Sequence, residues 1–147
     1  MPAAVDQARR ARRPYGAVLL GTGSGAVVAG ARCTTDISGD PTAHAEVNLL
    51  RKAAEAGLDL ASHVVVTTAE PRPMCAGALL WGKVWGVAYG TSVTKLISYG
   101  IPQIDLSFTA VAQRSRPMVR PAVACDVRSD LTDPLYSRST GPAGETA

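Results

Sequence analysis

Short apolar runs and polar segments alternate along this chain, and the pattern predicts strands and helices in turn. Residues 15–20 and 26–32 are apolar runs joined by a glycine-rich turn, which indicates a β-hairpin with a loop longer than two residues. The β-branched run over residues 64–68 is uninterrupted, as is typical of a strand covered on both faces. Residues 84–89 form a further predicted strand.

Helices are predicted between and after these strands. A leading helix spans residues 1–13, because Pro14 biases the residue before it away from helical angles. The central helix begins at Asp40-Pro41, a good helix start, and Gly57 closes it. The other predicted helices are 73–82, 91–98, 127–136 and a short one within 101–113.

The order of these elements predicts a three-layer α/β/α fold with a five-stranded mixed sheet. The fifth strand lies within residues 117–125, where two prolines favour the edge of a sheet. We expect residues 1–14 to form an N-terminal helix or arm, residues 15–137 one domain, and residues 138–147 a flexible tail. A domain in a chain of 147 residues is large enough to bury roughly 70% of the surface that its unfolded chain exposes.

Composition and charge narrow the class of protein. The chain is 46% hydrophobic and 18% charged, and no apolar run approaches the ~20 residues of a membrane span, so the composition is that of a soluble protein. Its first residues lack the apolar segment of a secretion signal, and we expect a cytoplasmic location. Three widely spaced cysteines argue against a disulfide framework. The cluster Arg9, Arg10, Arg12 and Arg13 is interpreted as a solvated helix face in preference to a nucleic-acid footprint.

Two separated segments carry the candidate chemistry. Residues 41–46 read PTAHAE, and residues 70–78 read EPRPMCAGA. Zinc-dependent base and nucleoside deaminases use H-x-E followed by P-C-x-x-C, in which the His and both Cys hold the metal and the Glu moves protons without touching it. The chain keeps this pattern except that Arg72 occupies the position of the first Cys.

These segments resemble the D-P-T-A-H-A-E and E-P-C-x-M-C-x-G-A motifs of the cytidine and deoxycytidylate deaminase superfamily, in particular its guanine deaminase and tRNA adenosine deaminase branch. The likeness covers roughly residues 15–100. It implies a cytidine deaminase-like fold, a homodimer and a small heterocyclic substrate, namely a nucleobase, a nucleoside or a related ring amine. A tRNA substrate is the less favoured alternative, and no membrane partner is expected.

The resemblance also assigns roles to single residues. His44 and Cys75 correspond to zinc ligands, and Glu46 corresponds to the proton shuttle. The positions expected to face the substrate are Cys33, Ala45, Pro71 and Arg72. Cys33 stands where the superfamily sets an Asn that contacts the bound base or ribose, so two pocket positions differ and indicate a changed substrate or reaction.

The predicted helix starts give these residues a common location. Residues two positions apart in sequence lie ~200° apart around an ideal helix. His44 and Glu46 therefore converge on one metal only if His44 lies at the first turn of the helix. The Asp40-Pro41 start places it there. Cys75 also lies at a predicted helix start, where the helix dipole and free N–H groups favour the thiolate over the thiol.

Arg72 leaves the metal site open to three interpretations, because a guanidinium has no lone pair to give and catalytic zinc ordinarily has three protein ligands. In the first, Cys33 supplies the third thiolate. In the second, the metal is lost and Arg72 pairs with Glu46 and a Cys75 thiolate. In the third, zinc is held weakly, and water or another side chain completes its shell.

Three functions follow from these interpretations. The first is a divergent deaminase-type hydrolase with an incomplete zinc site, and zinc is the only cofactor implied. The second is a metal-free binding or partner subunit that keeps the fold. The third is an enzyme of altered reaction that uses the thiolate of Cys75 or Cys33.

Overall fold

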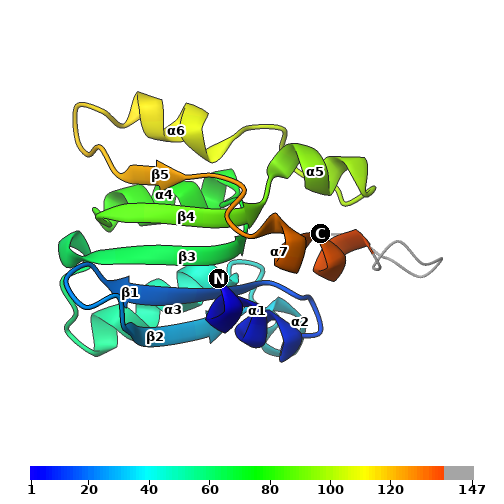
Figure 1. Ribbon diagram of the computed structural model, residues 1–147, viewed down its shortest axis with the longest axis horizontal. Helices are drawn as coiled ribbons and strands as arrows, with labels where there is room; N and C mark the ends of the chain where they lie inside the picture. The colour runs from blue at the N-terminus through cyan, green and yellow to red at the C-terminus, as the bar shows by residue number, and fades with distance from the viewer. Residues whose placement is uncertain (138–147) are drawn as a thin grey trace.

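The computed structural model describes residues 1–137 and contains the predicted five-stranded mixed sheet (Figure 1). The predicted flexible tail, residues 138–147, lies outside the described residues. The strand order is β2-β1-β3-β4-β5. Pairing is antiparallel from β2 through β1 to β3 and parallel from β3 through β4 to β5. The strands are β1 (Gly16–Gly21), β2 (Val27–Arg32), β3 (His63–Ala69), β4 (Gly86–Thr91) and β5 (Ala122–Ala124).

Helices cover both faces of this sheet, as the three-layer prediction requires. The helices α3 (Ala45–Glu55) and α4 (Pro73–Trp81) lie on one face, and α1 (Pro2–Arg9) and α7 (Ser129–Ser137) lie on the other (Figure 1). The shorter helices are α2 (Thr35–Ser38), α5 (Val93–Ser98), α6 (Phe108–Arg114) and a single 3₁₀ turn, Leu60–Ser62.

Neighbouring side chains of β3 enter different cores, which explains its continuous β-branched run. Val65 packs in the large core under α3 and α4, together with Leu49 and Leu79. Val66 points to the opposite face, where it packs with Ala4 of α1. Successive side chains of a strand alternate between faces, so a strand covered on both sides needs apolar residues at every position.

The N-terminal segment is part of this packing. α1 ends at Arg9, earlier than the predicted limit at residue 13, and its Ala4, Val5 and Ala8 are fully or almost fully buried against the sheet. The backbone of α1 comes so close to β1 that a side chain at Gly16 would meet Ala4 and Ala8. No helix among residues 1–137 combines the length and apolar character needed to span a membrane.

The predicted start of the central helix at Asp40 is wrong, because these residues form a turn. The side-chain oxygen Oδ1 of Asp40 accepts hydrogen bonds from the backbone N–H of Thr42 at 2.8 Å and from its hydroxyl at 2.7 Å. The side chains of Asp and Asn often accept a hydrogen bond from the backbone N–H two residues later, and the resulting turn competes with helix formation. Helix α3 therefore begins at Ala45, and His44 is its N-cap residue, with extended angles of φ −70° and ψ 159°.

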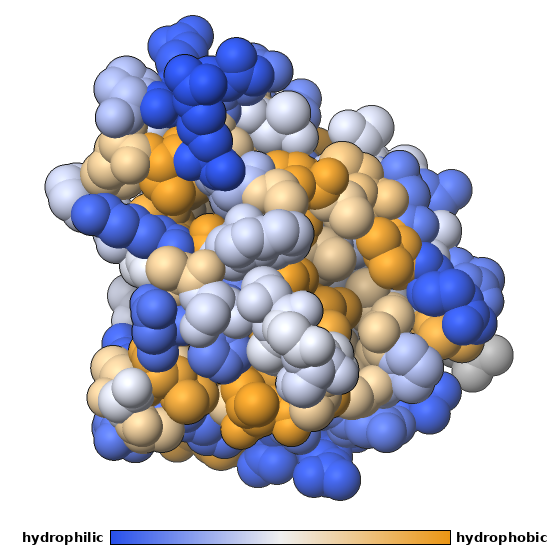
Figure 2. Space-filling view, turned by 60° about the vertical axis from the view of Figure 1, so that its left-hand side comes forward, coloured by the Kyte–Doolittle hydropathy of each residue, from blue (hydrophilic) through white to orange (hydrophobic). Residues whose placement is uncertain are grey.

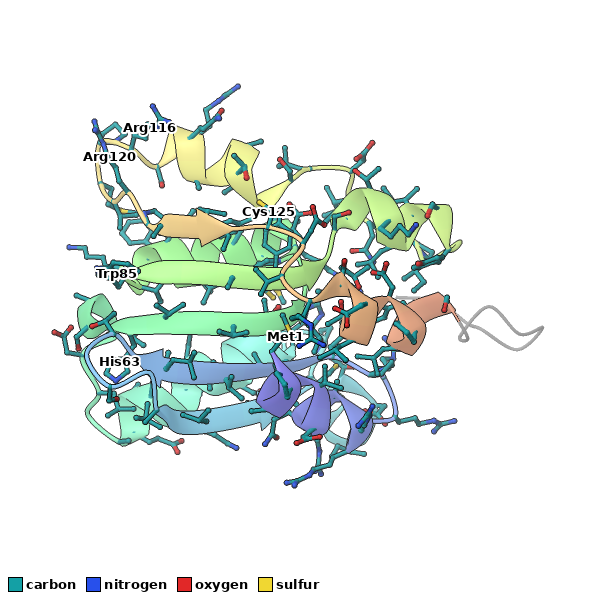
Figure 3. The ribbon with its side chains drawn as sticks, viewed as in Figure 1. Met1, His63, Trp85, Arg116, Arg120 and Cys125 are labelled. Atoms are coloured by element: carbon teal, nitrogen blue, oxygen red, sulfur yellow. The ribbon has the colours of Figure 1, made fainter. Side chains whose placement is uncertain are left out.

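One end of the sheet carries exposed aromatic residues. Figure 3 shows His63 and Trp85 at this end, where β3 and β4 begin. Trp81 and Trp85 are 76% and 53% exposed. Figure 2 brings this end forward and shows hydrophobic residues interrupted by hydrophilic ones. The carboxyl ends of the parallel strands lie at the opposite end, where the motif residues are found.

Candidate active site

Two helix starts meet at the carboxyl ends of β2 and β3. Both strands are antiparallel to β1, so they run in the same direction. α4 follows β3 directly and α3 follows β2 after α2, which places both helix N-termini at the same end of the sheet. A helix N-terminus carries a partial positive charge and free N–H groups.

Three motif side chains converge at this point. His44 and Glu46 come from the start of α3, and Cys75 comes from the first turn of α4. Their possible ligand atoms all lie within 4.8 Å of one another. His44 Nδ1 lies 3.4 Å from Cys75 Sγ. The structure therefore brings an imidazole, a carboxylate and a sulfur to one place, partly or fully shielded from solvent.

The carboxylate of Glu46 is buried and fixed by a strand residue. Its side chain is 6% exposed, and its Oε1 accepts a hydrogen bond of 2.8 Å from the hydroxyl of Thr67 on β3. A buried carboxylate needs such a partner because it has lost its contacts with water. Thr67 was not identified as a site residue from the sequence, although a hydroxyl in a buried apolar run indicates a hidden polar partner.

The thiol of Cys75 does not have the low pKa expected from its helix start. Burial raises its pKa well above the ordinary value, and the charge and hydrogen bonding of Glu46 raise it further. The positive charge of Arg72 acts in the opposite direction but does not outweigh them. The side chain is 1% exposed, so water cannot stabilise a thiolate. This arrangement disfavours Cys75 as a free thiolate nucleophile.

The surroundings of His44 lower the pKa of its imidazole, which favours the neutral form. Burial lowers its pKa, Glu46 opposes this effect, and the positive charges of Arg72 and Arg13 lower the pKa further. A neutral imidazole has a lone pair on one ring nitrogen, which is what a metal ligand requires.

Arg72 turns toward an aromatic residue instead of pairing with Glu46. Its Nη2 donates a hydrogen bond of 3.0 Å to the hydroxyl of Tyr15, and its Cζ lies 5.0 Å from the centroid of the same ring. Within residues 1–137, Arg72 forms no ion pair with Glu46, so the predicted pairing of these two side chains is wrong. A partly buried guanidinium is stabilised by stacking on an aromatic face, which explains this alternative position.

Tyr15 extends this contact to the other face of the sheet. Its ring lies 5.2 Å from that of Tyr136 in α7, and Tyr136 donates a hydrogen bond of 2.8 Å to the hydroxyl of Thr68. Burial raises the pKa of Tyr15, although the adjacent Arg72 lowers it. No periodic pattern in the sequence marks Tyr15, because its partners Arg72 and Tyr136 are 57 and 121 positions away.

The other predicted site residues surround this cluster. Cys33 is buried, but its Sγ contacts the hydroxyl of Thr35 at 3.4 Å and does not belong to the group formed by the three converging side chains. Its role as a third ligand stays a prediction. Ala45 and Pro71 are both buried, at the start of α3 and just before α4.

A pocket of about 200 Å³ opens beside His44. Its lining residues come from the end of the N-terminal segment, from α2 and from the loop that precedes α3: Arg13, Thr35, Gly39, Pro41 and His44. The pocket gives a small molecule access to the imidazole side of the cluster.

Comparisons with known proteins find sequence matches that include both motif segments. Residues 1–91 match the sequence family described as the cytidine and deoxycytidylate deaminase zinc-binding region. A guanine deaminase of Bacillus subtilis (strain 168) is 37% identical over 89 residues, which make up 59% of this chain and 56% of that protein. A tRNA(Ile)-lysidine synthase of Deinococcus radiodurans is 40% identical over 100 residues, which make up 66% of this chain and 17% of that protein.

Solved structures extend the likeness beyond the motifs. A structure from a study of A-to-I editing by tRNA:A34 deaminases superimposes with a TM-score of 0.75 and 27% identity, covering 92% of this chain and 96% of that one. The match to the guanine deaminase spans little more than half of that protein, and the match to the lysidine synthase a much smaller part.

Proposed function

This chain belongs to the cytidine and deoxycytidylate deaminase family, and from that membership we propose that it is a deaminase-type hydrolase with an incomplete zinc site. Its proposed substrate is a small nucleobase, nucleoside or related heterocyclic amine. The observation that carries the proposal is the convergence of His44, Glu46 and Cys75 at the starts of two helices. A homodimer is proposed from the resemblance alone.

The cluster fits a zinc ion by its donor chemistry. Zinc binds His nitrogen at about 2.0–2.1 Å and Cys sulfur at about 2.3 Å, so two such ligands on a tetrahedral ion lie about 3.5 Å apart. The separation of 3.4 Å between His44 Nδ1 and Cys75 Sγ is close to this value. Arg72 cannot ligate, so the site offers one protein ligand fewer than usual, and zinc is proposed to bind weakly.

Bound zinc would supply a nucleophile by lowering the pKa of water toward ~7. The chain's own carboxylate is proposed to move the protons. Glu46 would accept a proton from the attacking water and pass it to the ring and then to the leaving amine, while a C–O bond replaces the C–N bond and ammonia leaves. Thr67 donates to Oε1 of Glu46, which fixes the carboxylate beside His44 and Cys75, and this carboxylate is proposed to exchange the protons.

Cys33, Ala45, Pro71 and Arg72 are proposed to border the substrate. The small pocket beside His44 favours a single ring over a large ligand. The likeness to a tRNA:A34 deaminase structure makes RNA the alternative substrate to include in any assay.

A metal-free binding or partner subunit is the second candidate function. The observation that favours it is the cation at position 72, which is hydrogen-bonded to Tyr15 where the motif requires a ligand. In this candidate, the fold and pocket persist but the hydrolytic step is absent.

Ammonia release tests the choice between these candidates. The purified chain, supplied with zinc, would be offered a panel of nucleobases, nucleosides and single-stranded RNA. We expect one ring amine to release ammonia, and Glu46→Gln to lower the rate by about 10²-fold or more because proton transfer is lost. Glu55→Gln changes an exposed residue of the same helix and should leave the rate unchanged. If no substrate releases ammonia from zinc-loaded protein, the hydrolase proposal fails and the binding candidate stands.

A further inference from the structure

A half-buried arginine that forms no ion pair with any described residue lies beside the candidate active site. Arg13 lines the pocket that opens next to His44. Within the described residues, its guanidinium forms no ion pair. Most arginines of residues 1–137 likewise form no ion pair, since such pairs are confined to Arg9, Arg51 and Arg128. Arg13 differs from the other arginines of the described chain in that it lines this pocket.

The pocket around Arg13 contains no acidic lining residue. Among its other lining residues, Thr35 and His44 have polar side-chain atoms. Gly39 and Pro41 have no side-chain atom that can form a hydrogen bond. The negative charge of Glu46 and the positive charges of Arg72 and Arg13 all act on His44, in opposite directions. Glu46 does not line the pocket and accepts a hydrogen bond from Thr67, and within residues 1–137 it forms no ion pair with either arginine.

The hydroxyl of Thr35 is placed to assist a bound anion. Its Oγ1 lies 3.4 Å from Cys33 Sγ, and either atom can be the donor. When the thiol donates, the hydroxyl hydrogen is free to point into the pocket. Cys33 would thereby orient the hydroxyl of Thr35. An Asn at this place would bind that hydroxyl more strongly, because an amide is a stronger donor and acceptor than a thiol.

We propose that this pocket binds an anionic oxygen group of the substrate, a phosphate or a carboxylate, with Arg13 as its principal contact and Thr35 as a second donor. A guanidinium matches the oxygens of either group with two parallel hydrogen bonds. The substrate would then be an anionic ring amine, such as a nucleoside monophosphate, and not a free base. The identity of the ring rests on the proposed function, whereas anion binding at Arg13 does not.

Equilibrium binding tests this proposal without turnover. Isothermal titration of the full chain would use inorganic phosphate, and adenosine, guanosine and cytidine each paired with its 5′-monophosphate. We expect at least one monophosphate to bind about tenfold or more tightly than its nucleoside, since a hydrogen bond to a charged group accounts for that much. Equal affinities within every pair, or no binding of any phosphate, would overturn the proposal.

Two neighbouring arginines supply the matched variants. Arg13→Gln should weaken monophosphate binding about tenfold or more and leave nucleoside binding unchanged, whereas Arg12→Gln alters an exposed neighbour and should change neither. Arg13→Lys keeps the charge but loses the fork, so an intermediate affinity is expected and guards against a folding defect in the first variant.

Binding of RNA distinguishes a specific anion pocket from a general basic surface. If a single-stranded RNA oligonucleotide binds and both arginine variants weaken it equally, with a steep salt dependence, the arginines act as a diffuse phosphate footprint and the pocket proposal is overturned. Absence of ammonia release would end the proposed function but would not alter these binding results, so the two failures are distinguishable.

Discussion

In the proposed zinc site, Arg72 is a permanent cation at the position where the deaminase motif has a Cys. The guanidinium is not left unsatisfied, because it donates to the Tyr15 hydroxyl and lies over the same ring. A residue that binds one partner in two ways is held more firmly than one with a single contact. Tyr15 therefore stabilises the guanidinium of Arg72, a charge that the deaminase motif does not contain at this position.

Tyr15→Phe tests this stabilisation. Removing the hydroxyl leaves a half-buried guanidinium without one acceptor, and we expect the free energy of unfolding to fall by about 0.5–1.5 kcal/mol in urea denaturation. The loss should be smaller when Arg72→Cys is already present, because the partner is gone. Tyr99→Phe, whose ring contacts Lys95, serves as the control. Equal losses in both backgrounds would show that Tyr15 acts independently of Arg72.

At the residue scale, the sequence predicts the motif side chains but not what holds them. His44, Glu46 and Cys75 stand at recognisable spacings in two segments. Thr67 and Tyr15 belong to or border strands, and strand pairing brings them to the site from distant positions. No local pattern encodes that proximity. The pKa direction of Cys75 was also missed, because burial outweighs the helix start and depends on the whole fold.

Glu70, the first residue of the second motif segment, joins two helices. Its Oε2 accepts from the backbone N–H of Val93 at the start of α5 (2.7 Å), and its Oε1 accepts from that of Phe108 at the start of α6 (2.8 Å). The side chain is 3% exposed. A single carboxylate thus satisfies free N–H groups of two helix starts, which gives this motif position a structural role.

Glu70→Gln should destabilise the fold. The amide keeps one acceptor oxygen and sets its NH₂ group against the second backbone N–H, which leaves a buried donor unpaired. We expect a loss of about 1–3 kcal/mol in the free energy of unfolding. The exposed change Glu55→Gln should stay within about 0.5 kcal/mol of the parent protein. A Glu70 variant as stable as that control would mean that the two helix starts do not depend on the charge.

Element boundaries were predicted best where a single residue type decides them. Gly57 adopts φ +65° after α3, as its predicted role at the helix end requires. The helix start predicted at Asp40 is wrong because Asp favours both a helix start and a side-chain turn. The two hydrogen bonds from Thr42 to Asp40 stabilise the turn. The amide of Asn48 then binds the carbonyls of Arg32 and Ala43, which holds the end of β2 beside the start of α3.

Across the whole molecule, α7 closes the second helical layer through close contact with β4. The hydroxyls of Thr91 and Thr132 lie 2.8 Å apart, and Thr91 also donates to Asp133 at 2.7 Å. A side chain at Gly90 would meet Thr132 and would lie 2.8 Å from the carbonyl oxygen of Thr68. This packing joins residues about 40 positions apart and could not be predicted from sequence periodicity.

Gly90→Ala should therefore destabilise the protein. The added methyl group overpacks the contact between β4 and α7, and we expect a loss of about 1–3 kcal/mol in thermal or urea unfolding. Gly77→Ala is the matched change, because nothing lies within 4 Å of a side chain added there and alanine is the better helix former. It should stabilise by up to about 1 kcal/mol. Similar effects of both substitutions would contradict the packing described for α7.

Zinc binding tests the central claim most directly, because the claim is that this family site has two protein ligands and a cation in place of the third. Zinc content by elemental analysis and zinc affinity by chelator competition would be measured for the parent chain, Arg72→Cys, and Arg72→Cys combined with Cys75→Ser. We predict well under one zinc per chain in the parent, near one in Arg72→Cys with affinity raised roughly 100-fold or more, and loss of that gain in the double variant. Stoichiometric, tightly held zinc in the parent chain, or no gain in Arg72→Cys, would contradict the account.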